Sequence, residues 1–435
     1  MISGALRPHV LGMTPRRAAR LAWSAAALAF WAGAAAAQEP TILAGEAFTR
    51  TVFGMTFDVP ARDRATVTEV FAGVGWIPDG PDGKSVNPEA ALLLWRQREG
   101  GARRLRAVLL GLYDDVRWNR RIGRDADLVL TFENTTFPWA RSEYAGGERL
   151  QSEELTWGSV RAGAGVAFRT PLAPGHADNS FEGSLSYEPG FLYFSAGSAA
   201  APGFVAPSNA YEGRLHARVR ADAFTRNLLE LPHAGWAAGL DAWAAHRAGW
   251  EDWGGGPTGT HAAAYARSWT ALSGYALAAF PLPIGDGRHR LLAAVYAGTG
   301  SNLDRFSAFR LSGGSNAGDT ETITRPLLPT AGLDEIVSRG YVIASLEARA
   351  QLAFFLFLHL RGTLASVDRT VRDAAGTPIP RTDSPNAVTL GLTSGFFWSS
   401  AIELSWSRNA ALESRSGDGF TAGRDGVYVS FTKTF

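Results

Sequence analysis

The chain has 435 residues, a formal net charge of +1 at neutral pH, 46% hydrophobic residues and no cysteine. The near-zero charge argues against the basic footprint of a nucleic-acid-binding protein. Without cysteine there are no disulfides, thiolate metal sites, thiol nucleophiles or lipidated N-terminal cysteine. The length suits two soluble domains or one large barrel.

The first 37 residues are predicted to be a secretory signal peptide. Residues 16–20 contain three arginines ahead of a short apolar run at 21–33, and three alanines precede Gln38, so cleavage after residue 37 fits. The run is shorter than the roughly 20 residues of a membrane-spanning helix. An ordinary signal is favoured over the twin-arginine route, because the apolar block does not directly follow the arginine pair.

Beyond residue 37 the apolar residues are dispersed in alternation with polar ones. Between Tyr211 and Ala223 every second residue is apolar or small, and those between them are Glu212, Arg214, His216, Arg218, Arg220 and Asp222. A β-strand sends alternate side chains to opposite faces. In a barrel such an apolar face meets lipid and the polar face lines the lumen, whereas in a soluble β-rich protein, the alternative, it packs in a core.

This pattern predicts an all-β fold, a transmembrane antiparallel β-barrel of about 16 strands that fills residues 47–435 after a short N-terminal segment at 38–46. Expected strands cover 47–59, 66–77, 89–99, 104–120, 126–137, 152–169, 180–196, 209–225, 235–250, 262–280, 288–301, 338–351, 354–368, 386–398, 399–409 and 425–435. Long connectors mostly alternate with tight turns, as in outer-membrane barrels. This strand count places the connection at 78–88 on the periplasmic side, where it is long for a turn.

The C-terminus resembles the sorting signal of outer-membrane barrels. The last strand places Phe431 and Phe435 on one face and Tyr428 on the other. These three residues are predicted to form the sorting signal. A terminal aromatic residue suits the membrane interface, and the strand edge can pair with the assembly machinery or the first strand. We therefore expect a protein of the Gram-negative outer membrane. Its expected partners are membrane lipid, lipopolysaccharide and, during insertion, the barrel assembly machinery.

The longest loop, 302–337, follows the expected eleventh strand. It contains Arg310-Leu-Ser-Gly-Gly-Ser-Asn316 and leads into Ser338-Arg339-Gly340-Tyr341, and the next strand includes Leu346-Glu347-Ala348-Arg349. With the terminal strand, this region (288–368) resembles the BamA/TamA-type bacterial surface-antigen superfamily of 16-stranded assembly-factor barrels. The chain departs from that family in three ways. It separates Asn316 from Arg339 by 22 residues, and the aspartate-glycine signature expected in the next strand is not clear at Gly362–Asp368. We also expect a member without periplasmic polypeptide-transport-associated domains.

The resemblance implies roles for the residues of this loop–lumen motif. Arg339 would fold into the lumen and meet an acidic wall residue, for which Glu347 is a candidate. Gly340 would permit a tight backbone, Tyr341 would pack beside it, and Arg349 belongs to the strand signature. A buried guanidinium needs such a partner, because an isolated charge in a low-dielectric site is costly.

Charged side chains are expected to line the lumen. Besides Glu347 and Arg349 they are Arg161, Glu212, Arg214, Arg218, Arg220, Asp222, Arg361 and Glu403. A lattice of ion pairs that braces the wall is favoured over an anion-preferring pore. Aromatic residues near strand ends are expected to form interfacial girdles: Trp118, Phe137, Trp139, Trp236, Trp250, Trp253 and Trp398.

Two functional hypotheses follow. One is a surface-antigen barrel without periplasmic modules, with a structural or translocation-related role, and the alternative is a porin-like channel for small solutes. The sequence has neither a G-x-S-x-G elbow nor histidines at metal-binding spacing, so no catalysis, metal or cofactor is expected. A loop 302–337 that plugs the lumen favours the first hypothesis, and an open lumen favours the second.

Overall fold

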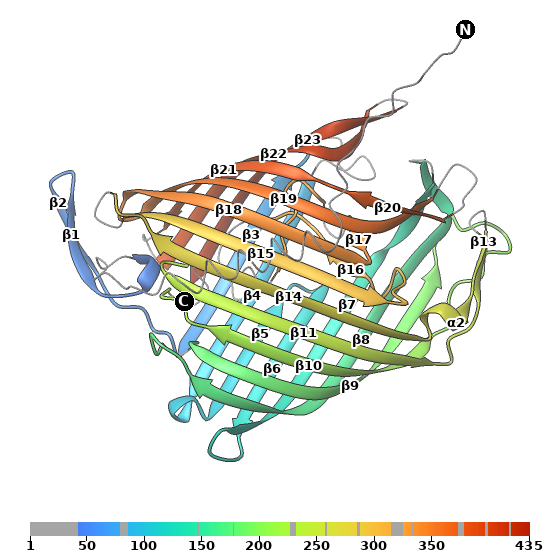
Figure 1. The fold of residues 1–435 in the computed structure, drawn as a ribbon, viewed down its shortest axis with the longest axis horizontal. Helices are drawn as coiled ribbons and strands as arrows, with labels where there is room; N and C mark the ends of the chain where they lie inside the picture. Colours follow the sequence, from blue (N-terminus) through green and yellow to red (C-terminus); the bar gives the residue numbers. More distant parts are fainter. Residues whose placement is uncertain are drawn as a thin grey trace, which may run out of the picture.

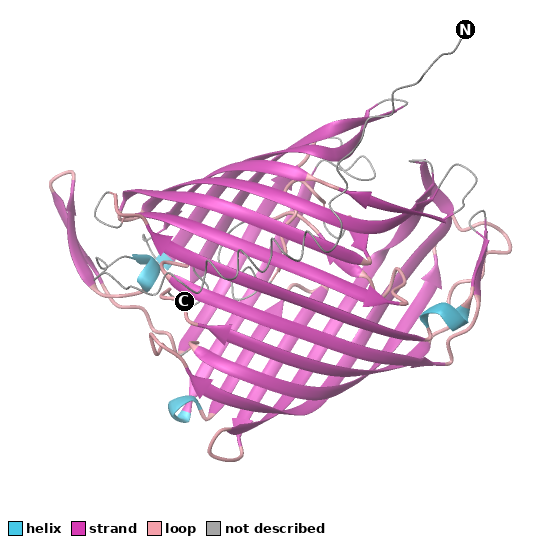
Figure 2. Cartoon of the chain, viewed as in Figure 1, coloured by secondary structure: helices cyan, strands magenta, loops and turns pink. Residues whose placement is uncertain are grey.

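The computed structural model describes residues 42–78, 86–145, 148–176, 178–226, 232–256, 259–284, 288–314, 325–332, 335–372, 378–395, 399–416 and 419–435. The predicted signal peptide, 1–37, lies outside the described residues. Long tilted strands wind round a common axis, and helical turns occur only at the ends of this cylinder in the described part (Figures 1 and 2). Among these residues, no helix is long and apolar enough to cross a membrane.

The strands close into one antiparallel barrel with sixteen wall positions. They are β3 (Thr66–Trp76), β4 (Val86–Arg98), β5 (Arg103–Leu109), β6 (Tyr113–Arg121), β7 (Ala126–Ala145), β8 (Glu148–Pro171), β9 (Ser180–Ala196), β10 (Ala210–Asp222), β11 (Gly235–Ala248), β14 (Ser268–Pro281), β15 (His289–Ser301), β18 (Gly340–Ala353), β19 (Leu356–Arg372), β20 (Pro378–Asp383), β21 (Asn386–Gly395), β22 (Ser400–Ser416) and β23 (Gly419–Thr434). Because β20 and β21 both pair with β19, they share one position. The barrel closes where β23 pairs with β3, from Val427 opposite Trp76 to Thr434 opposite Glu69.

The two faces of the wall differ in the way that the alternation predicts. In β10, Leu215 points outward and is 47% exposed, whereas the next residue, His216, points inward and is 6% exposed. Leu346, Leu360 and Leu404 likewise lie exposed on the outer face of their strands. Such a continuous apolar exterior would be unfavourable in water and is the normal surface of a barrel in lipid. The chain is a transmembrane antiparallel β-barrel, which confirms the predicted fold class.

Two of the predicted strands are wrong, and their errors cancel in the count. Residues 47–59 form a separate hairpin of β1 (Phe48–Val52) and β2 (Met55–Val59), so the barrel begins at Thr66. Residues 104–120 are two strands, β5 and β6, because the chain turns at Gly111, which has φ +79°. Both positions involve residues at positive φ, which alternation alone does not reveal.

This correction also resolves the long connection after the first barrel strand. With β3 as strand one, the link between β3 and β4 lies at the end opposite the C-terminus, where the other long loops lie. Shorter elements decorate the two ends: η1 (Ile42–Ala44), η3 (Glu99–Gly101), β12 (Trp253–Gly256), β13 (Gly259–His261), α2 (Ala263–Ala266), β16 (Phe309–Leu311) and β17 (Ile336–Ser338).

The long-loop end is also bridged across its opening. The backbone of Ala145, at the end of β7, pairs with Arg372, at the end of β19. These two strands stand half-way round the barrel from each other in the order of the sheet. The extended ends of opposite walls therefore meet over the mouth.

Candidate functional site in the barrel lumen

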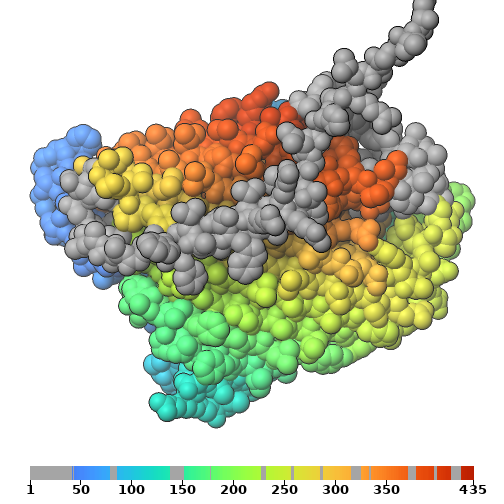
Figure 3. Space-filling view, in the orientation of Figure 1, coloured from blue at the N-terminus to red at the C-terminus, as the bar shows by residue number. Residues whose placement is uncertain are grey.

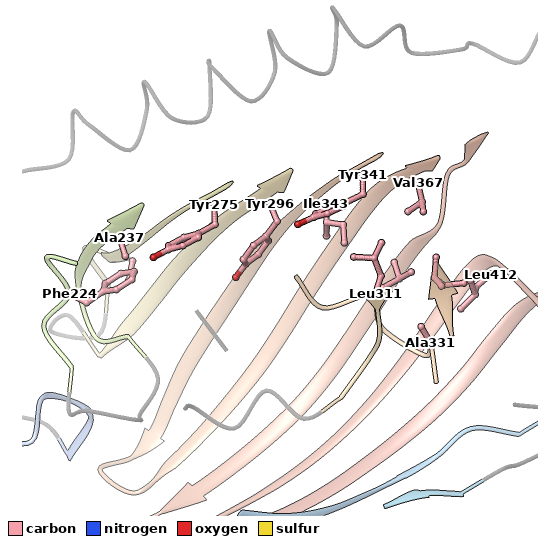
Figure 4. Packing of buried hydrophobic residues seen from close by; sticks show 13 residues of the cluster. Phe224, Ala237, Tyr275, Tyr296, Leu311, Ala331, Tyr341, Ile343, Val367 and Leu412 are labelled. Carbon is pink, nitrogen blue, oxygen red and sulfur yellow. The ribbon is translucent and has the colours of Figure 1, made fainter. Parts of the chain in front are cut away.

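The described parts of loop 302–337 lie inside the barrel. β16 pairs with β17, and Leu311 and Ile336 from these short strands are buried. They share one apolar cluster with wall residues of the lumen face, which include Tyr275 of β14, Tyr296 of β15 and Ile343 of β18. Figure 4 shows these wall side chains on successive strands, with Leu311 beside Ile343. The loop therefore packs on the inner wall.

Ion pairs fix this loop to two distant parts of the wall. Arg247 of β11 places Nη1 2.6 Å from Oδ2 of Asp304, and Arg424 of β23 places Nη1 2.7 Å from Oε2 of Glu335. β11 and β23 are seven positions apart in the sixteen-position barrel, so they stand almost opposite each other. Because both arginines are buried, each needs its carboxylate. The described residues of the loop are therefore anchored on nearly opposite sides of the lumen.

Backbone contacts hold the middle of the loop near the second anchor. The side-chain amide of Asn409 donates to the carbonyl of Pro329 at 3.1 Å, and the amide of Gly313 donates to the carbonyl of Ala331 at 2.9 Å. A Cβ at Gly313 would lie 2.6 Å from the hydroxyl oxygen of Tyr428. A side chain at Gly313 would thus push the loop away from β23. This close approach explains why the first residue of the Gly313-Gly314 pair is glycine.

Arg339 does not occupy the position that the family resemblance implies. It is exposed, its guanidinium lies 5.5 Å from the ring centre of Tyr265 in α2, and Nη2 donates to the Tyr265 hydroxyl. A bend before β18 explains this placement, since the Ser338 hydroxyl donates to the carbonyls of Gly340 at 2.6 Å and Asp368 at 2.8 Å. The expectation that Arg339 meets a lumen carboxylate is therefore corrected.

The two residues after Arg339 also differ in their roles. Gly340 is the first residue of β18. Its φ is not positive, so its backbone conformation does not require glycine. Tyr341 does point inward, where its ring meets that of Phe309 edge-on at 5.2 Å. It therefore binds the loop by ring packing.

Glu347 is the centre of a buried charge cluster made by wall residues alone. Its carboxylate accepts hydrogen bonds from Arg349 Nη2 at 3.0 Å and Arg361 Nε at 2.9 Å, and lies 3.0 Å from His359 Nδ1. Arg349 also donates to the carbonyl of Pro232 at 2.8 Å, in the turn between β10 and β11. The structure thus brings together Glu347, Arg349 and Arg361.

The remaining predicted arginines form a lattice along β7–β11. Arg161 bridges Glu133 at 2.9 Å and Glu212 at 2.6 Å. Arg214 also pairs with Glu133, at 2.9 Å, and with Glu188, at 2.7 Å. Arg218 and Arg220 approach Asp241 at 2.7 and 3.6 Å. Since every one of these arginines has a carboxylate partner, the geometry favours the bracing lattice.

This lattice continues into the first loop anchor. The second carboxylate oxygen of Glu212 accepts from Arg247 Nε at 2.8 Å and from the Trp269 indole at 3.0 Å. One chain of charges therefore runs from Arg161 through Glu212 and Arg247 to Asp304. Of the other predicted acids, Glu403 is buried, whereas Asp222 lies at the end of β10 and caps the amide of Phe224 at 3.0 Å.

The aromatic residues divide between the two faces. Phe431 and Phe435 are exposed, and the Phe435 amide joins the Thr68 carbonyl at 2.8 Å; Tyr428 is buried in the lumen.

The expected girdle is wrong for Phe137, Trp250 and Trp253, which are buried in a cluster with Phe306 of the loop. Trp118 and Trp236 are partly buried, whereas the side chains of Trp139 and Trp398 lie outside the described residues. Within the described ranges, no group of three or more metal-ligating side chains occurs.

Comparison with known proteins finds no matching family model and no curated relative. Among solved structures, the chain resembles BamA from Haemophilus ducreyi lacking POTRA domains 1-3, with 13% identity, a TM-score of 0.48, and coverage of 95% of this chain and 78% of that one. The barrel is similar to BamA. It also resembles CdiB from Acinetobacter baumannii (8% identity, TM-score 0.49, 90% of this chain, 66% of that one). CdiB from Escherichia coli is similar as well, with 11% identity, a TM-score of 0.46, and coverage of 91% of this chain and 68% of that one.

Proposed function

We propose that this chain is an outer-membrane barrel of the surface-antigen, assembly-factor type, with a structural or translocation-related role in a Gram-negative bacterium. Membrane lipid and lipopolysaccharide surround it in this proposal, and the barrel assembly machinery inserts it through its terminal segment. The observation that supports the proposal is the loop after the eleventh barrel strand, whose described residues pack inside the lumen and are fixed to β11 and β23.

A porin-like channel requires a lumen open to solutes. The loop instead packs its apolar side chains on the inner wall, the lattice arginines are neutralised, and the walls meet over the mouth. These three features support a closed resting state that opens only when the loop is displaced.

Conductance in planar bilayers tests the proposal. The wild-type barrel should show little steady conductance, and replacement of residues 305–337 by a short Gly-Ser linker should give a large and steady one. Arg424→Glu should give intermittent openings, because it repels Glu335, and the exchange Arg424→Glu with Glu335→Arg should restore closure. A large, steady conductance in the wild type would support the porin-like channel and overturn the proposal.

A further inference from the structure

The β1–β2 hairpin stands outside the barrel and has two chemically different faces. Register pairs Phe48 with Val59, Arg50 with Phe57 and Val52 with Met55, which puts these six residues on one mainly apolar face. The other face is polar, with Thr49 bonded to Asp58 at 2.7 Å and Thr51 to Thr56 at 3.0 Å. A lone two-stranded sheet gains stability only when such an apolar face is covered.

The base of the hairpin is covered by the barrel, but its tip is not. Phe48 and Phe57 meet the ring of Phe354 at 5.9 and 5.7 Å, in the short turn between β18 and β19. At the tip, Phe53 is 90% exposed and Met55 is 57% exposed. The hairpin thus begins on the barrel rim and extends an apolar end away from it.

Phe53 occupies a position that favours other residues. It has φ +52° and is followed by Gly54 at φ +77°, the conformation that two-residue hairpin turns normally fill with Asn-Gly or Asp-Gly. A bulky side chain is rare at such φ values. An exposed aromatic residue held there indicates a contact that the hairpin tip makes with something apolar.

The position of the hairpin identifies this apolar surrounding. It lies at the end of the barrel where the chain terminates, and it runs across the ends of the wall strands (Figure 1). Figure 3 shows its blue residues projecting beyond that end. Leu352, two residues before Phe354, is 56% exposed on the outer wall, so the lipid-facing surface reaches the turn that the base of the hairpin covers. A hairpin that runs across the strand ends at this rim is placed beside the membrane surface.

We propose that β1–β2 is an interfacial anchor, which inserts Phe53 and Met55 into the lipid leaflet at the turn-rich end of the barrel. Aromatic side chains favour this interfacial region. The polar face, with Thr49 and Thr51, then faces the water. The anchor would hold the chain before β3 flat against the membrane.

Single cysteines test this placement cleanly, because the chain contains none. Phe53→Cys would be spin-labelled in the full-length barrel in phosphatidylcholine–phosphatidylglycerol vesicles, with Thr51→Cys as the polar-face control and Leu346→Cys as the lipid-facing control. The collision rate of each label with oxygen, relative to a water-soluble nickel complex, reports its surroundings. At residue 53 this ratio should approach that at residue 346 and exceed that at residue 51 several-fold.

Two further measurements keep the result decisive. The mobility shift of unheated protein in detergent gels establishes that each labelled barrel is folded. Met55→Cys provides a second position on the apolar end, so that perturbation of the turn at residue 53 cannot decide the outcome alone. If labels at both residue 53 and residue 55 are accessible to nickel in folded barrels, the anchor proposal is overturned. If that access is lost only when periplasmic extract is added, this surface binds a protein partner instead of lipid.

Discussion

At the scale of single residues, the cluster round Glu347 shows how much of the lumen depends on paired charges. The carboxylate holds Arg349 and Arg361, both inside the wall. Glu347→Gln should lower the free energy of unfolding by about 3–5 kcal/mol, because it removes the carboxylate that both buried guanidinium groups contact. Unfolding of the folded barrel by denaturant in detergent micelles measures this loss.

The matched control is Glu99→Gln. Glu99 meets Arg103 at 3.2 Å with both side chains about half exposed, so the expected change is below about 1 kcal/mol. A similar destabilisation by the two substitutions would contradict the role assigned to Glu347.

Arg339 and Arg424 should also behave differently when each is replaced by alanine. Arg339 is exposed and contacts Tyr265, so Arg339→Ala should change stability by no more than about 1 kcal/mol. Arg424→Ala removes the buried partner of Glu335 and should cost about 2 kcal/mol or more. It should also speed proteolytic cleavage within 302–337. The opposite ranking, with the larger effect at Arg339, would restore the role that the family resemblance gives to that residue.

Sequence alternation was enough to assign wall side chains to the lumen, because a strand repeats every two residues. Arg161, Glu212 and Glu347 all point inward as expected. Asp304 and Glu335 could not be found in this way, since a loop has no fixed period. The position of Arg339 could not be predicted either, because the bend at Ser338 turns its side chain away from the lumen. A three-residue motif contains no signal for such a bend.

At the scale of elements, the turn between β10 and β11 is fastened to the barrel by two arginines. Arg290 Nε donates to the carbonyl of His233 at 2.9 Å, and Arg349 Nη1 donates to that of Pro232 at 2.8 Å. Burial lowers the pKa of His233 to about 3, and the positive charges of Arg290 and Arg349 act in the same direction. His233 is therefore neutral in the folded barrel at pH 7.

The folded-state pKa of His233 lies below the unfolded value of about 6.5. Its contribution to stability is therefore complete above that value and is lost as the pH falls toward 3. Between pH 7.5 and 4.5 the free energy of unfolding should fall less in His233→Gln than in the wild type, because glutamine cannot be protonated. Denaturant unfolding at the two pH values measures this difference, and parallel pH dependence in both proteins would refute it.

Strand prediction succeeded where the alternation was long and failed at tight turns. The sequence indicated β10 almost to its ends, because its polar and apolar sets are well separated, whereas β23 begins at Gly419, six residues before the expected start. It missed the turn at Gly111 and the hairpin turn at Phe53-Gly54, where the backbone rather than the side-chain pattern changes. A positive φ at a non-glycine residue such as Phe53 leaves no mark on hydropathy.

At the scale of the whole molecule, the lumen has two unlike halves. The wall from β5 to β11 presents the ion-pair lattice, whereas the wall from β14 to β19 presents, beside the Glu347 cluster, the tyrosines and aliphatic side chains on which the loop packs. Asp304 joins the two halves, because it meets Arg247 at the edge of the lattice. Displacement of the loop must therefore both expose apolar wall and break ion pairs, which stabilises the closed state.

The bridge over the mouth provides a separate test of the closed architecture. Ala145 and Arg372 pair through their backbones although they belong to opposite walls. Cysteines at paired positions are close enough for a disulfide, which requires Cα atoms roughly 4.4–6.8 Å apart. Ala145→Cys with Arg372→Cys should therefore form an intramolecular disulfide under mild oxidation in the membrane, with loss of both free thiols.

Two controls make this test interpretable in a chain without cysteines. Each single variant should retain its thiol or form only dimers, and Thr389→Cys with Ser407→Cys should crosslink, because those side-chain oxygens lie 2.8 Å apart in the β21–β22 ladder. Crosslinking at 389 and 407 without crosslinking at 145 and 372 would mean that opposite walls do not meet in the membrane. In that case loop 302–337 alone would have to close the lumen, and removing it should open the barrel fully. If the disulfide forms, the loop-deleted barrel should conduct more in reductant than after oxidation.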